Sequence, residues 1–388
     1  MTSSRSLPPV GALLCAFFVT GNACAAEAEL TPIVASVISK PWPVRSCGGE
    51  RHLVYELNLS NPTGGDAVLR KIEVVDADTN KVLSTIDEAG LKKRLSIGGQ
   101  RGDESNTLKP AQFGVAFLHV RIDETQRRPR NLTHRIEGFF AKPGRDFTTT
   151  AGETNVLARV PAVLGAPLAG KGFLAGDGCC DSIRHVRALL PIDGRFSLAQ
   201  RFAIDWEQAD ENNRLVTGDP KVLTNYVIYG KDVYAVANGT VVASRNDLPE
   251  QVPGALPANI PLDEADGNFV VLSIGRGAHV LYAHMQPGSV RVKAGDRVRR
   301  GAPLGKVGNT GNSQAPHLHL HVMDGPSPLK SDGIPYVFER FTLTAVDEAG
   351  TEDFDKAEAT GSPLTLTPVS PNRVCRNALP LDLSVVTF

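Results

Sequence analysis

The chain has 388 residues, of which 41% are hydrophobic and 21% are charged, and its formal net charge at pH 7 is −1. This length and composition predict two globular domains, each with its own core, and a smaller appendage. The near-neutral charge gives no support to nucleic acid or an anionic membrane as a partner, because both attract strongly basic surfaces.

The first 25 residues are typical of a signal peptide. Arg5 supplies the positive charge, residues 10–19 form an apolar run that is too short to span a bilayer, and residues 23–25 form a small-residue cleavage site. We expect cleavage after Ala25; the alternative, lipidation of Cys24, lacks the leucine that such signals usually carry. The mature chain is therefore predicted to be exported, and no later segment is long and apolar enough for a transmembrane helix.

Four cysteines follow the predicted signal peptide: Cys47, Cys179, Cys180 and Cys375. An even number in an oxidising compartment indicates two disulfides. Because neighbouring cysteines rarely bridge each other, we expect Cys179 and Cys180 to pair with Cys47 and Cys375. A zinc site made of these cysteines is less well supported, since no Cys-x-x-Cys spacing occurs.

Residues 28–165 contain short strands separated by turns. Leucine and tyrosine alternate with other residues over 53–59, and residues 113–122 form a longer strand that is apolar on both faces. Since 37 Gly and 27 Pro supply many turns and no helical pattern interrupts these strands, we predict an immunoglobulin-like β-sandwich. We interpret its three scattered histidines as structural or surface residues: His52, His119 and His134.

Small and glycine-rich residues over 166–182 predict a linker, and residues 183–341 read as a second all-β domain of many short strands. Within that domain, residues 233–244 predict a β-hairpin that turns at Asn238-Gly239, and the proline-rich residues 245–265 predict an inserted surface loop. Residues 342–388 are expected to be an extension that packs on the other domains.

A strand near residue 320 carries three histidines. After a turn-rich lead that ends at Pro316, His317, His319 and His321 alternate with leucine. A strand has a period of two, so the three imidazoles are expected on one face and the leucines on the core face. Histidine is not favoured in strands, and imidazole is the commonest protein ligand of borderline metals such as zinc.

Two further polar residues lie in apolar stretches of the same domain. Asp205 precedes Trp206, and His284 follows Tyr282-Ala283. A buried carboxylate must be paired or bound. Zinc hydrolases need three protein ligands, an open position for water and a residue that moves protons, and these residues together offer that set.

Six short motifs occur in one order, and together they resemble the lysostaphin/LytM-type zinc metallopeptidases. The motifs lie at residues 239–242, 267–268, 281–285, 298–301, 305–311 and 316–319. The resemblance covers roughly residues 195–325. It implies an antiparallel β-sheet domain with an open groove, and peptide-bond hydrolysis in bacterial peptidoglycan, which indicates a periplasmic location.

The family pattern is His-x-x-x-Asp, a distant histidine after Tyr-Ala, and His-x-His. Carried over, Asp205 and His319 resemble the zinc ligands, and His284 and His317 resemble the catalytic histidines. The first histidine of the pattern is replaced by Arg201. Arginine has no lone pair to donate to a metal.

Three arrangements follow from this replacement. Arg201 could pair with Asp205 and leave a metal-free, inactive site. Alternatively, His321 completes a zinc site with Asp205 and His319. A further alternative brings His185 from the preceding segment.

Retention of the other four family residues favours an active site. The predicted function is thus a zinc metalloendopeptidase that acts on peptidoglycan peptides. The alternative is a metal-free module that binds peptidoglycan or activates another cell-wall hydrolase.

Overall fold

The structure is a computed structural model that describes residues 1, 28–98, 100, 102 and 104–388. The predicted signal peptide and the alternative lipidation site at Cys24 lie outside the described residues. All strands and helices named below lie in one compact unit, Pro32–Phe388. Within the described part of the chain, no helix has the length and apolar character needed to cross a bilayer.

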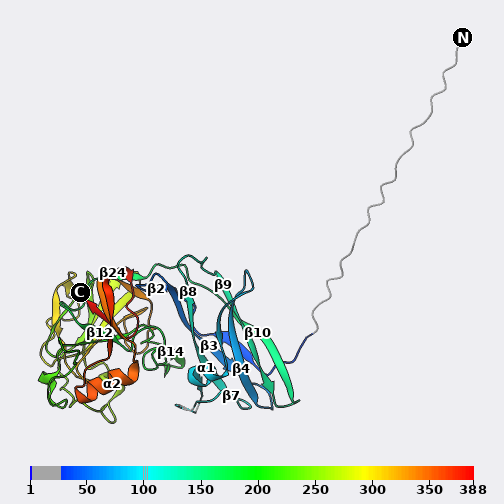
Figure 1. Ribbon diagram of the computed structural model, residues 1–388, viewed down its shortest axis with the longest axis horizontal. Helices are drawn as coiled ribbons and strands as arrows, with labels where there is room; N and C mark the ends of the chain where they lie inside the picture. Colours follow the sequence, from blue (N-terminus) through cyan, green and yellow to red (C-terminus); the bar gives the residue numbers. More distant parts are fainter. Residues whose placement is uncertain (2–27, 99, 101, 103) are drawn as a thin grey trace. The chain divides into compact units, whose positions relative to one another are not determined.

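Residues 34–155 form two antiparallel five-stranded sheets (Figure 1). The first has the order β1-β3-β8-β6, with β2 beside β3: β1 (Val34–Val37), β2 (Val44–Arg45), β3 (Arg51–Ser60), β6 (Leu95–Ile97) and β8 (Phe113–Ile122). The second has the order β10-β9-β4-β5, with β7 beside β4: β4 (Ala67–Asp76), β5 (Lys81–Ile86), β7 (Thr107–Leu108), β9 (Asn131–Phe140) and β10 (Arg145–Asn155). A short helix, α1 (Glu88–Arg94), connects β5 to β6.

One hydrophobic core joins these two sheets. The alternating residues of β3 over 53–59 point into it, and they meet Leu69 and Ile72 of β4 and Ile136 of β9. The predicted sandwich of alternating strands is therefore present, while its immunoglobulin-like topology stays a prediction.

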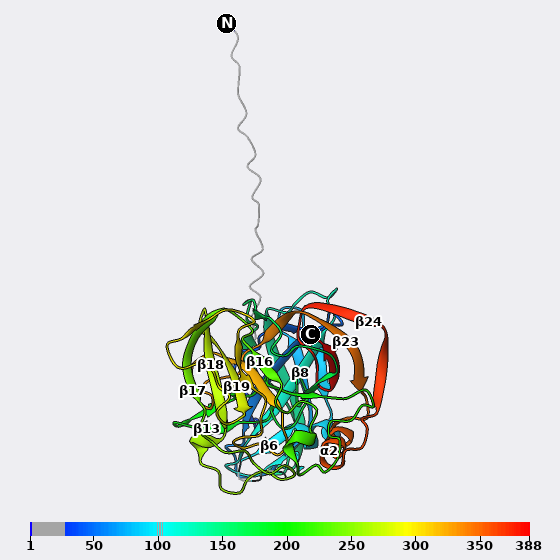
Figure 2. The same cartoon turned by 90° about the vertical axis from the view of Figure 1, so that its left-hand side faces the viewer.

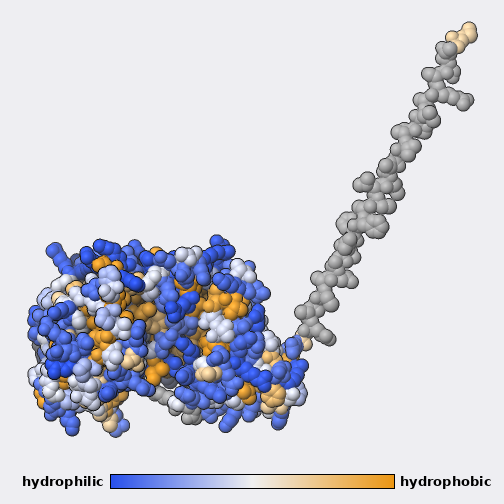
Figure 3. All heavy atoms as spheres, in the orientation of Figure 1, coloured by the Kyte–Doolittle hydropathy of each residue, from blue (hydrophilic) through white to orange (hydrophobic). Residues whose placement is uncertain are grey.

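Hydrophilic residues predominate on the face drawn in Figure 3, with hydrophobic ones scattered between them.

The second face of β8 is also buried. Val115 and Phe117 of this strand pack against Leu198, which lies in the second half of the chain. This contact explains why β8 is apolar on both faces, as the sequence predicted. It also places the sandwich directly against the segment that leads into the candidate site.

The rest of the chain is organised around an eleven-stranded sheet. Its main order is β11-β23-β25-β12-β15-β22-β19-β18-β17-β20, with β24 beside β23. Figure 2 shows β17, β18 and β19 next to one another. The strands are β11 (Ala162–Leu164), β12 (Phe173–Gly176), β15 (Ile204–Gln208), β17 (Gly239–Arg245), β18 (Asn268–Gly275), β19 (Ala278–Met285), β20 (Arg297–Val298), β22 (Leu318–Met323), β23 (Tyr336–Asp347), β24 (Leu366–Ala378) and β25 (Ser384–Thr387).

Smaller elements accompany this sheet. β13 (Leu190–Ile192) pairs with β14 (Arg195–Ser197), and β16 (Asp232–Tyr234) pairs with β21 (Pro303–Lys306). The helical segments are η1 (Leu223–Asn225), η2 (Leu262–Glu264) and α2 (Thr351–Thr360). The described chain is thus nearly all β, as the sequence predicted, and its strand pairs are antiparallel apart from β11 and β23, which pair in parallel.

The predicted hairpin at Asn238-Gly239 is wrong. β16 pairs with β21, whereas β17 pairs with β18 and β20. The backbone between β16 and β17 finds other partners: the N–H of Ala235 donates to Ala302 O, and the N–H of Val236 donates to the buried Tyr282 hydroxyl at 2.8 Å. Because these residues bond elsewhere, β16 and β17 do not pair with each other as a hairpin.

The main sheet extends beyond the predicted peptidase domain at both ends. β12 lies inside the predicted linker and pairs with β15 and β25. The predicted extension after residue 341 supplies β24, β25 and α2. β15, which carries Asp205, is therefore held between a strand of the linker and the histidine strand β22.

The two disulfides join Cys47 to Cys375 and Cys179 to Cys180. The predicted cross-pairing is wrong because Cys47 and Cys375 are already neighbours. A backbone bridge between Ser46 and Leu379 brings the segment before β3 against the end of β24, with the Cα atoms of Cys47 and Cys375 5.1 Å apart. Cys179 and Cys180 are left to bond to each other.

We predict that the Cys47→Ala/Cys375→Ala variant lowers the free energy of unfolding by about 2–5 kcal/mol. This disulfide links residues 328 positions apart, so its loss frees a long loop in the unfolded chain. The matched control is Cys179→Ala/Cys180→Ala, which opens a ring between adjacent residues and should cost much less. Denaturant unfolding of both variants measures the difference, and equal losses would contradict the loop argument.

Candidate metal and active site

Three neighbouring strands position the candidate site. In the register of β15 and β22, Asp205 lies opposite His319, and in that of β22 and β19, His319 lies opposite Ala283. His284 follows directly on β19, and His317 pairs with Gly308 just before β22. Backbone pairing therefore brings together four of the residues that the sequence predicted: Asp205, His284, His317 and His319.

The core-facing side of β22 is as predicted. Leu318, Leu320 and Val322 are fully buried in the main core of this sheet. The strand is buried on its histidine face as well, since His319 and His321 are 2% and 1% exposed. The histidines are thus not a solvated polar face.

Three imidazoles surround the carboxylate of Asp205. His319 Nδ1 lies 2.8 Å from Oδ1, and His317 Nε2 lies 3.4 Å from the same oxygen. His185 Nε2 lies 3.3 Å from Oδ2. His185 comes from the segment between β12 and β13. Its approach to Asp205 corresponds to the third arrangement considered from the sequence, in which His185 comes from the preceding segment.

Two groups of ligand atoms meet here, each within 4.8 Å. One group consists of His185, Asp205 and His319, and the other of His284, His317 and His319. The first has the mixed nitrogen and oxygen donors of catalytic zinc sites. The second extends the cluster towards the two residues that resemble catalytic histidines.

Backbone carbonyls orient three of the histidines. Nδ1–H of His185 donates to Asp177 O at 2.9 Å, that of His284 to Thr310 O at 2.7 Å, and that of His317 to Ala315 O at 2.8 Å. A carbonyl can only accept, so each neutral ring carries its proton on Nδ1 and has a lone pair on Nε2. This outer support is typical of histidines that bind metals or transfer protons.

His284 has an unusual backbone conformation. Its φ is 59°, in the left-handed region that non-glycine residues rarely adopt. Its N–H donates to Asp266 O, and its own carbonyl accepts from Gly308 N–H. Such conformations cluster at functional sites, where surrounding bonds maintain them.

His321 lies behind His319 and away from Asp205. Its Nδ1 is 2.8 Å from Nε2 of His319, whose other nitrogen faces Asp205. Nε2 of His321 is buried without a hydrogen-bond partner among the described residues. The geometry indicates that His321 orients His319. The assignment of His321 as a metal ligand, made from the sequence, stays a prediction.

Arg201 pairs with Glu56 of the sandwich and not with Asp205. Nε donates to Oε1 at 2.8 Å and Nη2 donates to Oε2 at 2.9 Å, while Nη1 donates to Gly333 O. Arg201 is 6% exposed and Glu56 is fully buried. The bidentate partner that the sequence suggested for arginine is thus a carboxylate on β3, and Asp205 remains available to the imidazoles.

Charge interactions shift the pKa values in this cluster. Burial alone would raise the pKa of Asp205, but His185, His317 and His319 hold it well below its usual range. Burial acts to lower the pKa of His185, but Asp205 outweighs it and raises the pKa to about 9. Burial lowers the pKa of His284, His319 and His321. The cluster therefore favours one positive charge beside Asp205, and a metal cation would compete with the proton for that position.

Sequence reasoning missed two buried carboxyl groups near the cluster. Glu207 follows Asp205 by two positions on β15 and so shares its face, a signal that was present in the sequence. Glu358 comes from α2, and its Oε2 accepts a 2.8 Å hydrogen bond from Gln314 Nε2. Burial raises the pKa of both groups, and Glu358 raises that of Glu207 further.

Residues 225–331 match the protein family described as Peptidase family M23. This segment is an M23 peptidase domain. The match confirms the LytM-type resemblance drawn from the ordered motifs. It contains His284, His317, His319 and His321, and it begins after Arg201 and Asp205.

Part of the chain is similar to part of the peptidoglycan DD-endopeptidase ShyA of Vibrio cholerae. The two chains are 28% identical over 152 residues, which are 39% of this chain and 30% of ShyA. The match thus spans less than a third of that relative's length.

Two solved structures are also similar. The catalytic domain of lysostaphin from Staphylococcus simulans is 22% identical, with 42% of this chain and 86% of that chain covered and a TM-score of 0.23. A zinc-containing peptidase from Vibrio cholerae is 16% identical, with 74% and 82% covered and a TM-score of 0.23.

We predict that Arg201→Met lowers the free energy of unfolding by about 3–5 kcal/mol, because Glu56 is left buried without its partner. The double variant Glu56→Gln/Arg201→Met should recover part of this loss. As a control for the loss of an arginine, Arg45→Met breaks a pair that is half exposed and should cost about 1 kcal/mol or less. Denaturant unfolding measures all three, and an Arg201→Met value close to that of Arg45→Met would refute the structural role of the pair.

Proposed function

We propose that this protein is an exported zinc metalloendopeptidase that cleaves peptide bonds in peptidoglycan. The observation that supports this most directly is the meeting of one carboxylate and two imidazoles, Asp205, His185 and His319, within 4.8 Å of one another. In this proposal His185 takes the ligand role that Arg201 cannot fill.

The chemistry of the donors fits zinc. Nε2 of His185 lies 3.3 Å from Asp205 Oδ2, and Nδ1 of His319 lies 2.8 Å from Oδ1 of the same carboxylate. Asp177 O supports His185, and His321 supports His319. When zinc is bound in such a site, it polarises water and the carbonyl of the scissile bond.

His284 and His317 can transfer the protons. Their ring centroids are 4.7 Å apart, and backbone carbonyls hold both rings through Nδ1, while Nε2 of His317 lies 3.4 Å from Asp205 Oδ1. A neutral imidazole can accept a proton from an attacking water, and an imidazolium can donate a hydrogen bond to the oxyanion of the tetrahedral intermediate.

Two further observations support a location in the bacterial envelope. Both pairs of cysteines among the described residues form disulfides, which persist in oxidising compartments. The relative ShyA is named as a peptidoglycan enzyme. We therefore propose that peptidoglycan peptides are the substrate.

The alternative is a metal-free module that binds peptidoglycan or activates another cell-wall hydrolase. One observation favours it: Glu56 holds Arg201 in the position where the family pattern has its first histidine. The two functions predict different responses to metal removal.

We predict that the purified protein contains about one zinc per chain and cleaves peptidoglycan sacculi. A chelator should abolish cleavage, and added zinc should restore it. His317→Ala should retain the zinc but lose activity by about 100-fold or more, because it removes proton transfer and leaves the ligands in place. Binding to sacculi without cleavage, unchanged by chelator, would establish the alternative module.

A second experiment separates the two possible third ligands. We predict that His185→Ala loses stoichiometric zinc, whereas His321→Leu still binds zinc with an affinity that is about 10–100-fold weaker, as expected for loss of a supporting residue. Zinc titration against a competing chelator measures both. If His321→Leu loses zinc and His185→Ala retains it, the ligand set predicted from the sequence is correct.

A further inference from the structure

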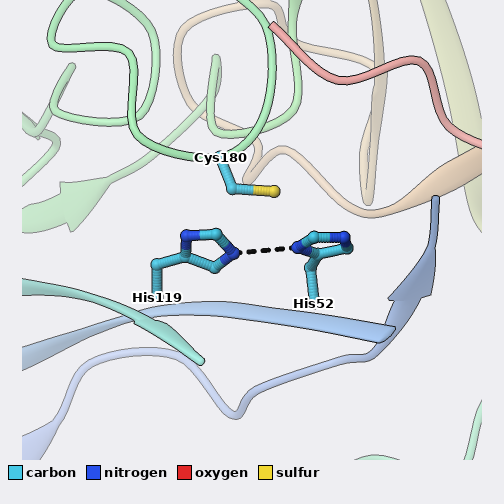
Figure 4. A group of neighbouring side chains, drawn as sticks. All are labelled: His52, His119 and Cys180. Atoms are coloured by element: carbon cyan, nitrogen blue, oxygen red, sulfur yellow. Dashed lines mark hydrogen bonds between the residues drawn. The ribbon is translucent and has the colours of Figure 1, made fainter. Parts of the chain in front are cut away.

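A second group of metal-binding side chains lies away from the M23 site. Ligand atoms of His52, His119 and Cys180 lie within 4.8 Å of one another. His52 and His119 come from β3 and β8 of the sandwich, and Cys180 comes from the segment that follows β12. Figure 4 shows the sulfur of Cys180 above the gap between the two rings, with the facing nitrogens joined by a hydrogen bond.

Asp181 orients this group. Its Oδ2 accepts a 2.8 Å hydrogen bond from Nδ1–H of His119. Oδ1 of Asp181 pairs with Nη2 of Arg94 at 2.5 Å, which holds the group as a carboxylate. His119 therefore directs the lone pair of Nε2 towards His52, whose Nδ1 is 2.9 Å away. A carboxylate that fixes the tautomer of a histidine in this way is a recurrent feature of metal sites.

His52 has an unused nitrogen. Its ring stacks on that of His119, with the ring centroids 5.2 Å apart, and its Nδ1 faces Nε2 of His119. The ring is 1% exposed, and its Nε2 has no hydrogen-bond partner within the described part of the chain. Oε2 of Glu50 is 4.0 Å from this nitrogen and is the nearby group that could accept a proton from it.

A cavity of about 270 Å³ reaches these residues. Its lining includes His52, His119, Cys179, Cys180 and Asp181. The site is therefore large enough to admit an ion and its water. In the present state the sulfur of Cys180 is bonded to Cys179 and is not a thiolate ligand.

We propose that reduction of the Cys179–Cys180 disulfide opens a second zinc site, formed by the Cys180 thiolate, His52 and His119. Sulfur and imidazole are the ligands that structural zinc sites use. The disulfide keeps this site closed, and its reduction supplies the missing ligand. The inference does not depend on zinc in the M23 site, which contains no cysteine.

The chemistry balances with a dithiol as reductant. The dithiol gives two electrons and two protons, the Sγ–Sγ bond breaks to form two thiols, and the dithiol becomes a cyclic disulfide. Zinc then displaces the proton of Cys180, which leaves to solvent. At His52, the proton moves from Nδ1 to Nε2, beside Glu50, so that Nδ1 is free to bind.

The test uses Co²⁺ as the probe and the full protein. The protein is reduced with dithiothreitol, freed of it by gel filtration without oxygen, and titrated with Co²⁺. We expect the reduced protein to bind about one further equivalent and to gain a near-ultraviolet thiolate-to-cobalt charge-transfer band. The oxidised protein should lack this band, because its M23 site offers only nitrogen and oxygen donors.

Variants then identify the ligands. His119→Gln should lose the band or weaken Co²⁺ binding by about tenfold or more. Arg121→Gln is the matched control, since it lines the same cavity without offering a ligand. Cys47→Ala/Cys375→Ala should keep the band, because those sulfurs belong to the other disulfide.

Three results would overturn the proposal. They are a reduced wild-type protein without the band, a band that His119→Gln leaves unchanged, and a band that survives in Cys179→Ala/Cys180→Ala. The wild-type comparison needs no substitution, so a variant that fails to fold does not weaken the test.

Discussion

The buried pair of Glu56 and Arg201 fixes how the two halves of the chain meet. Glu56 lies on β3 in the sandwich, and Arg201 lies just before β15. Both are removed from water, so each charge depends on the other for compensation. Since β15 carries Asp205, the sandwich holds the strand from which the candidate metal site is built.

This pairing also explains how a family position can change its role. An arginine cannot donate a lone pair to a metal, but it can join two structural elements through a bidentate carboxylate contact. In the function proposed here, the imidazole that the M23 pattern places at that position comes from His185, in a segment that precedes the matched family range. His185 would replace the family histidine in space and not in sequence position. Its Nε2 approaches Asp205 from outside the sheet, while His319 approaches from the neighbouring strand.

The sequence predicted the parts of the fold that depend on local periodicity. The alternation in β3, the two-sided apolar character of β8 and the histidine strand β22 all appear as expected, because a period of two determines which side chains share a face. Partners that are distant in sequence were harder to predict. The hairpin at Asn238-Gly239 failed because Ala235 and Val236 bond elsewhere, and the disulfides were mispaired because the register of Ser46 with Leu379 was unknown.

The same distinction applies to the residues of the candidate site: some follow from local sequence patterns, and others depend on distant partners. Asp205, His284, His317 and His319 could be found from motif and spacing, whereas the position of His185 depends on the path of the segment after β12. The partner of Arg201 was equally hidden, because Glu56 lies 145 residues earlier in the chain. Glu207 could have been noticed from its spacing to Asp205, but the sequence did not indicate that α2 would bring Glu358 beside it.

The contact between β8 and the start of the second half has a consequence for how the protein can be divided. A fragment that began after the sandwich would expose Leu198, which Val115 and Phe117 now cover, and would leave the guanidinium of Arg201 without its counter-ion. The half that contains the M23 domain is therefore not an autonomous module that could be transplanted onto another protein. The sandwich is an integral part of the structure that supports the M23 domain.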